Sequence, residues 1–198
     1  MPATLVIVDV QRDFCSGGAL AVPDAEAILP VVNGLIGEFT QVVATQDWHP
    51  PGHVSVASSH PGRRAFDSLA LPSGPQTLWP DHCVQETFGA ALHPALRLPP
   101  GTPIVRKGVH PDIDSYSGFF ENEGSTRVGL HAVLESLGAS EIVLVGLATD
   151  FCVLHTALDA RRLGYATTVV ESGCRGIDAH GSLAGAWRRM EQAGIRRR

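Results

Sequence analysis

The sequence contains no apolar stretch near the roughly 20 residues that a membrane-spanning helix needs. Its most hydrophobic early run, TLVIVDV at residues 4–10, is interrupted by Asp9. The run also lacks a basic lead and a small-residue cleavage site, so we expect no signal peptide. The sequence therefore predicts a cytoplasmic protein that makes no contact with a membrane.

The chain also lacks a marked excess of positive or negative residues, and it lacks a paired-cysteine motif. Its 15 Lys and Arg against 20 Asp and Glu give a net charge of −5, which argues against a general nucleic-acid binder. The only dense basic run is the terminal IRRR, which we interpret as a solvated helix end. The absence of a C-x-x-C pair argues against a structural zinc knuckle. A core of this size does not need disulfides between the four cysteines, Cys15, Cys83, Cys152 and Cys174.

Internal repeats and linkers are missing too, so residues 1–198 are interpreted as one domain. Strand-like and helical patterns alternate along it. The expected strands are residues 4–10, 41–47, 102–108, 140–146 and 166–172, and the expected helices are residues 24–39, 126–139, 151–164 and 180–194. Most of these strands are apolar on both faces, as in a sheet covered by helices. The pattern predicts a three-layer α/β/α domain with a mainly parallel central sheet.

Residues 48–103 do not follow this alternation. They are rich in Pro, Gly, Ser and His, and Cys83–Leu92 is the one stretch in which we consider a regular element. A long irregular segment inside a compact domain usually has a functional reason.

Cys152 stands where a reactive thiol is expected. The stretch GLATDFCV follows the expected strand EIVLVG, and Asp150 is a suitable N-cap for the helix that begins there. In the first turn of a helix, free N–H groups and the helix dipole favour a thiolate. The alternative is that Cys152 is a small core residue.

Three other reactive side chains stand at corresponding places. Asp9 lies late in the first expected strand, Asp47 ends the second and Lys107 ends the third. Each alone could be a turn cap, a loop carboxylate or a solvated strand end. Ligands of open parallel sheets bind beyond the carboxyl ends of the strands, so together with Cys152 these residues predict a catalytic site.

The irregular segment offers metal ligands. Asp47 and His49 are two residues apart, so both side chains can point toward one ion, and His82 adds a third ligand. This carboxylate and imidazole set suits one divalent metal ion, with zinc as the first choice and iron or manganese as alternatives. His53 and His60 are interpreted as surface or supporting residues. Trp48 and Trp79 would give the site aromatic walls.

Five motifs, taken in order, resemble those of the nicotinamidases, which are isochorismatase-like cysteine hydrolases. The motifs are VDVQRDFCSGGAL, TQDWHPPGHVS, TLWPDHCVQ, RKG and GLATDFCV, and they extend over nearly the whole chain. The resemblance implies hydrolysis of nicotinamide to nicotinate and ammonia in NAD salvage, with pyrazinamide as a further substrate. It also implies the family fold, a mainly parallel sheet between helices.

Position by position, the resemblance implies roles for particular residues. It implies a catalytic triad of Asp9, Lys107 and Cys152, and a metal site of Asp47, His49 and His82. It implies an oxyanion hole formed by the N–H groups of Ala148 and Cys152. It also implies aromatic contacts to the pyridine ring from Phe14, Trp79 and Tyr116. It also implies a cis peptide between Leu147 and Ala148, and it leaves open whether His53 joins the metal. Val56 departs from the common family pattern, in which phenylalanine is frequent.

Other functions stay open at this stage. One is an amidohydrolase of the same superfamily that acts on another small amide or a carbamoyl compound, and another is a non-catalytic metal-binding module on this fold. A dinucleotide-dependent dehydrogenase is disfavoured because no G-x-G-x-x-G follows the first strand. The sequence does not decide whether the chain forms a homo-oligomer.

Overall fold

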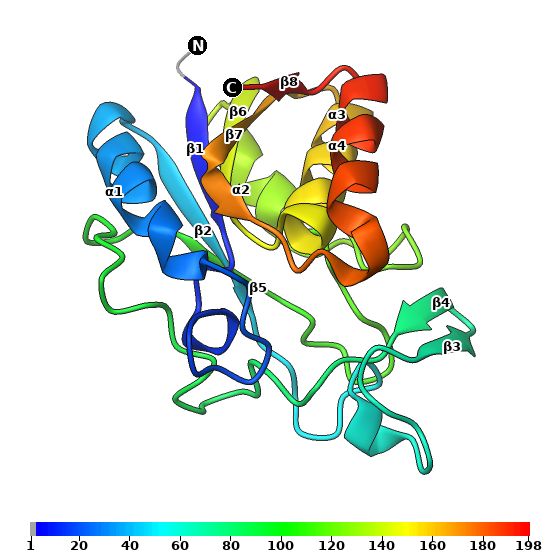
Figure 1. Ribbon diagram of the computed structural model, residues 1–198. Helices are drawn as coiled ribbons and strands as arrows, with labels where there is room; N and C mark the ends of the chain where they lie inside the picture. The colour runs from blue at the N-terminus through cyan, green and yellow to red at the C-terminus, as the bar shows by residue number, and fades with distance from the viewer. Residues whose placement is uncertain (1–2) are drawn as a thin grey trace.

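A computed structural model describes residues 3–198, and its centre is a six-stranded sheet with every neighbouring pair parallel. The strand order is β5-β2-β1-β6-β7-β8 (Figure 1). The strands are β1 (Thr4–Val8), β2 (Val42–Asp47), β5 (Ile104–Lys107), β6 (Glu141–Leu147), β7 (Ala166–Arg175) and β8 (Arg196–Arg197). The predicted mainly parallel sheet is confirmed. The two-residue edge strand β8 is an addition to it, and the interpretation of the terminal IRRR as a helix end is wrong, because Arg196 and Arg197 form this strand.

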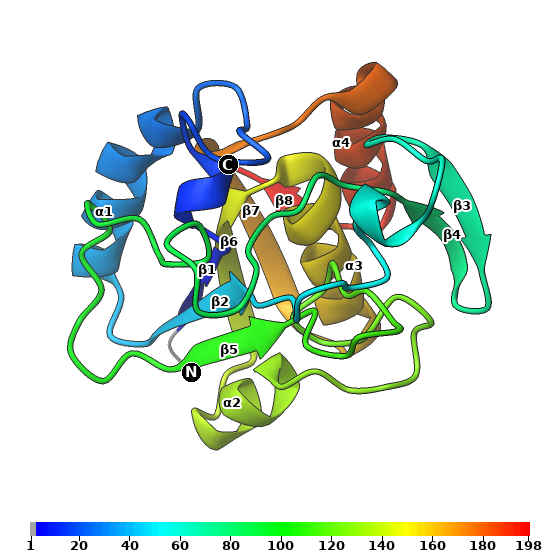
Figure 2. The ribbon, with the colours of Figure 1, turned by 90° about the horizontal axis from the view of Figure 1, so that it is seen from below.

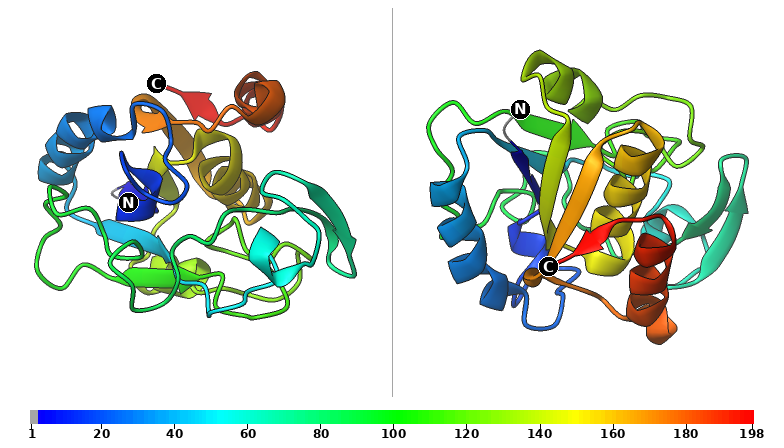
Figure 3. Two further views of the ribbon diagram at one scale, coloured as in Figure 1. Left: turned by 60° about the horizontal axis from the view of Figure 1, so that its bottom comes forward. Right: turned by 90° about the horizontal axis from the view of Figure 1, so that it is seen from above.

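Helices cover both faces of this sheet. Helix α1 (Leu29–Glu38) lies on one face, and α2 (Leu130–Ser136), α3 (Leu154–Arg162) and α4 (Ser182–Gln192) lie on the other (Figure 3). Short 3₁₀ turns occur at η1 (Arg12–Phe14), η2 (Ala25–Ile28), η3 (Ala57–Ser59) and η5 (Ala179–Gly181). The three-layer α/β/α expectation is therefore confirmed. No helix among residues 3–198 combines the length and apolar character needed to cross a membrane.

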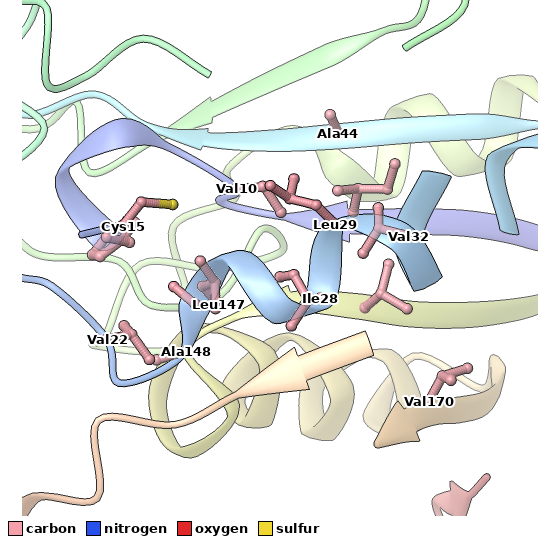
Figure 4. Close-up of a cluster of buried hydrophobic side chains, with 14 of the residues drawn as sticks. Val10, Cys15, Val22, Ile28, Leu29, Val32, Ala44, Leu147, Ala148 and Val170 are labelled. Carbon is pink, nitrogen blue, oxygen red and sulfur yellow. The ribbon is translucent and has the colours of Figure 1, made fainter. Parts of the chain in front are cut away.

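Side-chain alternation along β1 explains how one strand serves both layers. Leu5 and Ile7 belong to the core cluster under α1, whereas Val6 and Val8 belong to the cluster under α2, α3 and α4. All four side chains are buried because β1 lies between β2 and β6 inside the sheet. Figure 4 shows the α1 side of this core, where Ile28, Leu29 and Val32 lie beside strand residues such as Ala44.

The long segment after β2 contains more order than its composition indicates. It forms an antiparallel hairpin of β3 (Ser68–Leu71) and β4 (Gly74–Thr77), which stands apart from the main sheet (Figure 2). The expectation of an ordered element at Cys83–Leu92 is wrong, because that stretch consists of turns and isolated bridges. Propensity alone did not identify the hairpin, since Gly74 and Pro75 both disfavour a strand.

The chain leaves β6 through a π-helical turn, η4 (Thr149–Val153), which leads into α3. The expectation that Asp150 caps this helix is wrong, because Asp150 lies inside the turn and Ala148 precedes it. The Asp150 carboxylate instead accepts hydrogen bonds from the backbone N–H groups of Ile177 and Asp178 and from the Ser182 hydroxyl. It thereby joins the cysteine turn to the segment that enters α4.

Candidate active site

Four reactive side chains meet at one edge of the sheet because their strands are neighbours. Asp9 directly follows β1, Asp47 and Lys107 are the last residues of β2 and β5, and Cys152 lies in the turn after β6. Those four strands are consecutive in the order β5-β2-β1-β6. The four side chains are buried, and Asp9 and Lys107 have no exposed surface. The carboxyl ends of the strands thus form one shielded polar cluster.

The Lys107 ammonium group is the centre of this cluster. Its Nζ lies 2.9 Å from Asp9 Oδ2, 2.5 Å from Asp47 Oδ1 and 3.4 Å from Cys152 Sγ. It also donates to the Ser115 carbonyl at 3.1 Å. A buried ammonium with two carboxylates is compensated in charge, and it fixes the carboxylates relative to the thiol.

Asp9 has the environment of a general base. Its Oδ1 accepts a 2.6 Å hydrogen bond from the Thr45 hydroxyl, which leaves Oδ2 for Lys107. Ligand atoms of Asp9, Asp47 and Cys152 all lie within 4.8 Å of one another. Burial raises the pKa of the Asp9 carboxyl, and the Lys107 charge opposes that rise. A raised pKa makes this carboxylate a stronger proton acceptor.

The pKa of the Cys152 thiol is raised, whereas its position at the start of a helix suggests a lowered pKa. Burial raises its pKa well above the ordinary thiol value, and the Lys107 charge opposes the rise. The first turn of the helix favours a thiolate only where the helix dipole outweighs desolvation. Cys152 is therefore a thiol at rest, and it needs a nearby base such as Asp9 to become a nucleophile.

Asp47, His49 and His82 form a set that fits a divalent metal. The Nε2 atoms of His49 and His82 lie 3.5 Å and 3.7 Å from Asp47 Oδ2, and the three ligand atoms lie within 4.8 Å of one another. Each Nδ1 contacts a backbone carbonyl, that of Gly108 for His49 (3.0 Å) and that of Pro80 for His82 (2.8 Å). Because a carbonyl only accepts, each Nδ1 carries the proton, and both Nε2 lone pairs face the carboxylate. A cation between them satisfies all three.

His53 packs against His49, one of the three residues of this set. It is fully buried, and its ring stacks on the His49 ring with centroids 4.3 Å apart. Its Nε2 contacts the His110 carbonyl at 2.9 Å and its Nδ1 contacts the Ser55 hydroxyl at 2.7 Å, so both nitrogens have partners. His60 likewise donates from Nε2 to the Val54 carbonyl. In this arrangement both His53 nitrogens, and Nε2 of His60, are engaged away from the metal set.

Gly108 offers a test of the metal set. Its φ is +62°, and a Cβ there would lie 2.4 Å from His49 Cε1. We expect Gly108→Ala to move the His49 ring and to weaken metal affinity at least tenfold, since metal ligands depend on their supporting shell. The measurement is metal content after dialysis against a graded chelator.

A matched control separates backbone strain from the collision with His49. Gly101 has φ +79° and nothing within 4 Å of an added Cβ. Gly101→Ala therefore carries similar backbone strain without a neighbour and should retain the metal. Equal metal loss in the two variants would show that His49 does not depend on the space beside Gly108.

The cluster opens into a small cavity with aromatic walls. Phe14, Trp79 and Tyr116, the residues expected around a pyridine ring, all line it together with the metal set and Cys152. The Tyr116 hydroxyl accepts hydrogen bonds from Trp79 Nε1 (3.3 Å) and Gln76 Nε2 (3.2 Å). The β3–β4 hairpin, which contains Gln76, thus helps to fix one wall.

Some wall residues differ from the expectation. Trp48 is not among the lining residues, and its ring instead packs under the Arg106 guanidinium at 3.9 Å. Further lining residues are Leu20, Asp114, Phe151 and Ile177. Leu20 and Phe151 lie within motifs that the sequence analysis used, whereas Asp114 and Ile177 belong to segments that carried no signal.

The peptide between Leu147 and Ala148 is cis, as expected. Ala148 lines the cavity immediately after β6, and its carbonyl accepts hydrogen bonds from the Phe151 and Val153 N–H groups. Those bonds hold the turn that contains Cys152.

Comparison with known proteins agrees with this geometry. Residues 3–196 match the family model described as the isochorismatase domain. A nicotinamidase of Acinetobacter baylyi is 49% identical over 193 residues, which cover 98% of this chain and 90% of that protein.

Solved structures give the same result. A nicotinamidase and pyrazinamidase structure from Acinetobacter baumanii superimposes with a TM-score of 0.97 at 49% identity, covering 99% of this chain and 95% of that one. A Pyrococcus horikoshii pyrazinamidase in complex with zinc superimposes with a TM-score of 0.81 at 35% identity, covering 100% and 99%. The family match spans nearly the whole chain, and the chain belongs to the isochorismatase family of hydrolases.

Proposed function

We propose that this protein is a nicotinamidase, which hydrolyses nicotinamide to nicotinate and ammonia as a step of NAD salvage, and that it also accepts pyrazinamide. The observation that carries the proposal is one aromatic cavity that contains a thiol, a metal-binding set and, beside the thiol, a buried carboxylate–ammonium pair. The similarity to nicotinamidases over nearly the full length supports it. The proposal assigns residues 1–198 to one hydrolase domain.

The first chemical step forms a thioester. Asp9 takes the proton from Cys152, and the thiolate attacks the carboxamide carbon. Lys107, which contacts both groups, keeps the negative charge inside the cluster. The amide nitrogen then receives the proton from Asp9, the carbon–nitrogen bond breaks, and ammonia leaves.

The tetrahedral intermediate needs hydrogen-bond donors for its oxygen. We assign this role to the backbone N–H groups of Cys152, in the η4 turn, and of Ala148, which directly precedes that turn. Loss of one such donor typically costs on the order of 3 kcal/mol.

The second step releases nicotinate. Asp9, now ionised again, takes a proton from a water molecule, and the resulting hydroxide attacks the thioester carbon. The carbon–sulfur bond breaks, and Cys152 recovers its proton from Asp9. The net reaction consumes one water per amide.

The metal set serves orientation in this scheme. Asp47, His49 and His82 would hold a divalent cation, and zinc suits these ligands as it does the zinc-bound pyrazinamidase relative. When bound, the cation supplies a Lewis-acid anchor for the pyridine nitrogen. Phe14, Trp79 and Tyr116 would hold the ring, so that the carboxamide lies over the thiol.

The proposal also covers compartment and assembly. Four free, buried thiols suit the reducing cytoplasm, and a small amide is the only partner that the mechanism needs. Neither nucleic acid nor a membrane has a role in it, and the chemistry is compatible with either a monomer or a homo-oligomer.

A pH profile tests the role of Asp9. Because burial raises the pKa of Asp9 above its ordinary value of 3.8, the base becomes protonated at a higher pH than an exposed aspartate. We therefore expect kcat/KM to fall as the pH is lowered, with an apparent pKa above that of an exposed aspartate, and Asp9→Asn to remove the activity. An acid limb with an apparent pKa at or below that of a free aspartate would contradict the assignment of Asp9 as the base.

Ammonia release from nicotinamide by the purified, metal-loaded protein tests the function itself. We expect equimolar nicotinate and ammonia. Hydrolysis of other small amides or carbamoyl compounds but not of nicotinamide would establish the alternative amidohydrolase. Metal binding without release of ammonia from any amide would establish a non-catalytic module.

A further inference from the structure

A second group of potential metal ligands lies outside the catalytic cavity. It comprises the Cys15 thiol, the Glu26 carboxylate and the His93 imidazole, whose ligand atoms lie within 4.8 Å of one another. The three residues line a separate surface cavity that contains none of the residues lining the catalytic cavity. Cys15 follows η1, Glu26 belongs to η2, and His93 lies in the loop before β5, so three segments meet here.

The Glu26 carboxylate and the Cys15 thiol can each still bind a metal in their present positions. Glu26 accepts hydrogen bonds from the Ser16 backbone N–H at Oε1 (2.8 Å) and from the Ser16 hydroxyl at Oε2 (3.1 Å). Each carboxylate oxygen accepts more than one bond, so each retains a lone pair. Cys15 is a free thiol that lines the cavity and has 3% of its surface exposed.

His93 needs a small rearrangement to bind a metal. The Ala95 N–H donates to His93 Nδ1 at 3.2 Å, at the long end of the usual range. Coordination through Nδ1 replaces this contact, and coordination through Nε2 moves the ring proton to Nδ1 and also ends it. The cost is one weak hydrogen bond.

Burial, reinforced by the Glu26 charge, raises the pKa of Cys15 to about 11. A metal binds the thiolate form of cysteine, so a thiophilic cation must displace the thiol proton when it binds. Arg12 lines the same cavity, and its guanidinium stacks on the Phe88 ring at 3.9 Å.

We propose that Cys15, Glu26 and His93 form a second site for a thiophilic divalent cation of the zinc class, separate from the set of Asp47, His49 and His82. Thiolate, imidazole and carboxylate are the ligand types of zinc, and three protein ligands leave a position for water. A cation here ties together three segments. One of them, residues 12–20, includes Phe14 and Leu20 of the catalytic cavity wall.

Cadmium binding tests the site without relying on activity. In the metal-loaded enzyme carrying Cys152→Ala, the catalytic thiol cannot contribute, and the catalytic metal set contains no sulfur. We expect added Cd²⁺ to produce a sulfur-to-metal charge-transfer band whose intensity at saturation corresponds to one thiolate per chain. We also expect Cd²⁺ to raise Tm, since a ligand bound only by the folded state stabilises that state. In the same background, Cys15→Ser should abolish both effects.

Two further variants separate a built site from a lone thiol. Glu26→Gln keeps an acceptor for Ser16, and His93→Gln alters a partly exposed loop residue, so both should fold. We expect each to weaken cadmium affinity at least tenfold, whereas Cys174→Ala, which removes a buried thiol outside the cluster, should not change it. The proposal is overturned if the parent gives no band, if the band survives Cys15→Ser, or if neither Glu26→Gln nor His93→Gln weakens binding.

Discussion

Replacement of Cys152 by alanine is expected to lower kcat/KM for nicotinamide by about 10⁴-fold or more. Among residues 3–198, Cys152 supplies the only thiol that lines the catalytic cavity, and its sulfur lies 3.4 Å from Lys107 Nζ. Without it, neither Asp9 nor the metal set can form the thioester, and only positioning and oxyanion contacts remain. The measurement is ammonia release under conditions that detect a rate four orders of magnitude below that of the parent.

The chain provides its own control for this substitution. Cys174 is also a buried, free cysteine, but it lies in β7 outside the catalytic cavity. Cys174→Ala should retain turnover, with a stability loss from the smaller side chain as its main effect. If Cys152→Ala kept its metal, its Tm and a substantial part of its turnover, the thioester mechanism would be wrong.

The polar cluster could be predicted from the sequence because the carboxyl ends of parallel strands meet at one edge of a sheet, whatever the exact side-chain packing. Asp9 lies late in the first strand-like run, and Asp47 and Lys107 lie at the ends of the next two; parallel strands place their carboxyl ends at one edge. The order of the strands along the sheet then brings the side chains into contact, as the 2.5 Å and 2.9 Å Lys107 contacts show. The metal set followed from ligand types and from the spacing of Asp47 and His49.

Residues that act through tertiary contacts could not be predicted in this way. Asp150 has the side chain of a helix cap, but donors from Ile177, Asp178 and Ser182, more than 25 residues away, satisfy its carboxylate instead. Trp48 stands beside a metal ligand in the sequence, yet its ring stacks against Arg106. In both cases the competing partner is distant in sequence, so no local pattern records it.

Helix position and burial have opposite effects on the pKa of the Cys152 thiol. Helix position is a local property, and it favours a thiolate, whereas burial is a property of the whole fold and raises the thiol pKa. Burial is the larger effect here. A thiol that is neutral at rest requires a base, so the proposed mechanism depends on Asp9, whose carboxylate lies within 4.8 Å of the Cys152 sulfur.

Benzamide is expected to be a poor substrate beside nicotinamide and pyrazinamide. All three share the carboxamide and nearly the same shape, and each can lie between Phe14 and Trp79. Only nicotinamide and pyrazinamide carry a ring nitrogen meta to the carbon that bears the amide, so only they can reach a cation on Asp47, His49 and His82. We expect kcat/KM for benzamide to be lower by at least about a hundredfold, or about 3 kcal/mol, because both orientation and affinity are lost.

Removal of the metal completes the comparison. If the cation anchors the ring nitrogen, chelation should lower kcat/KM for nicotinamide far more than for benzamide, because benzamide gains nothing from the cation. A cation that only stabilised the fold would instead affect both amides equally, through the fraction of folded enzyme. Gly108→Ala, which should displace His49, ought to reproduce the selective loss in the presence of limiting metal. Comparable kcat/KM values for nicotinamide and benzamide in the metal-loaded enzyme would show that the ring nitrogen is not bound, and the anchoring role would have to be abandoned.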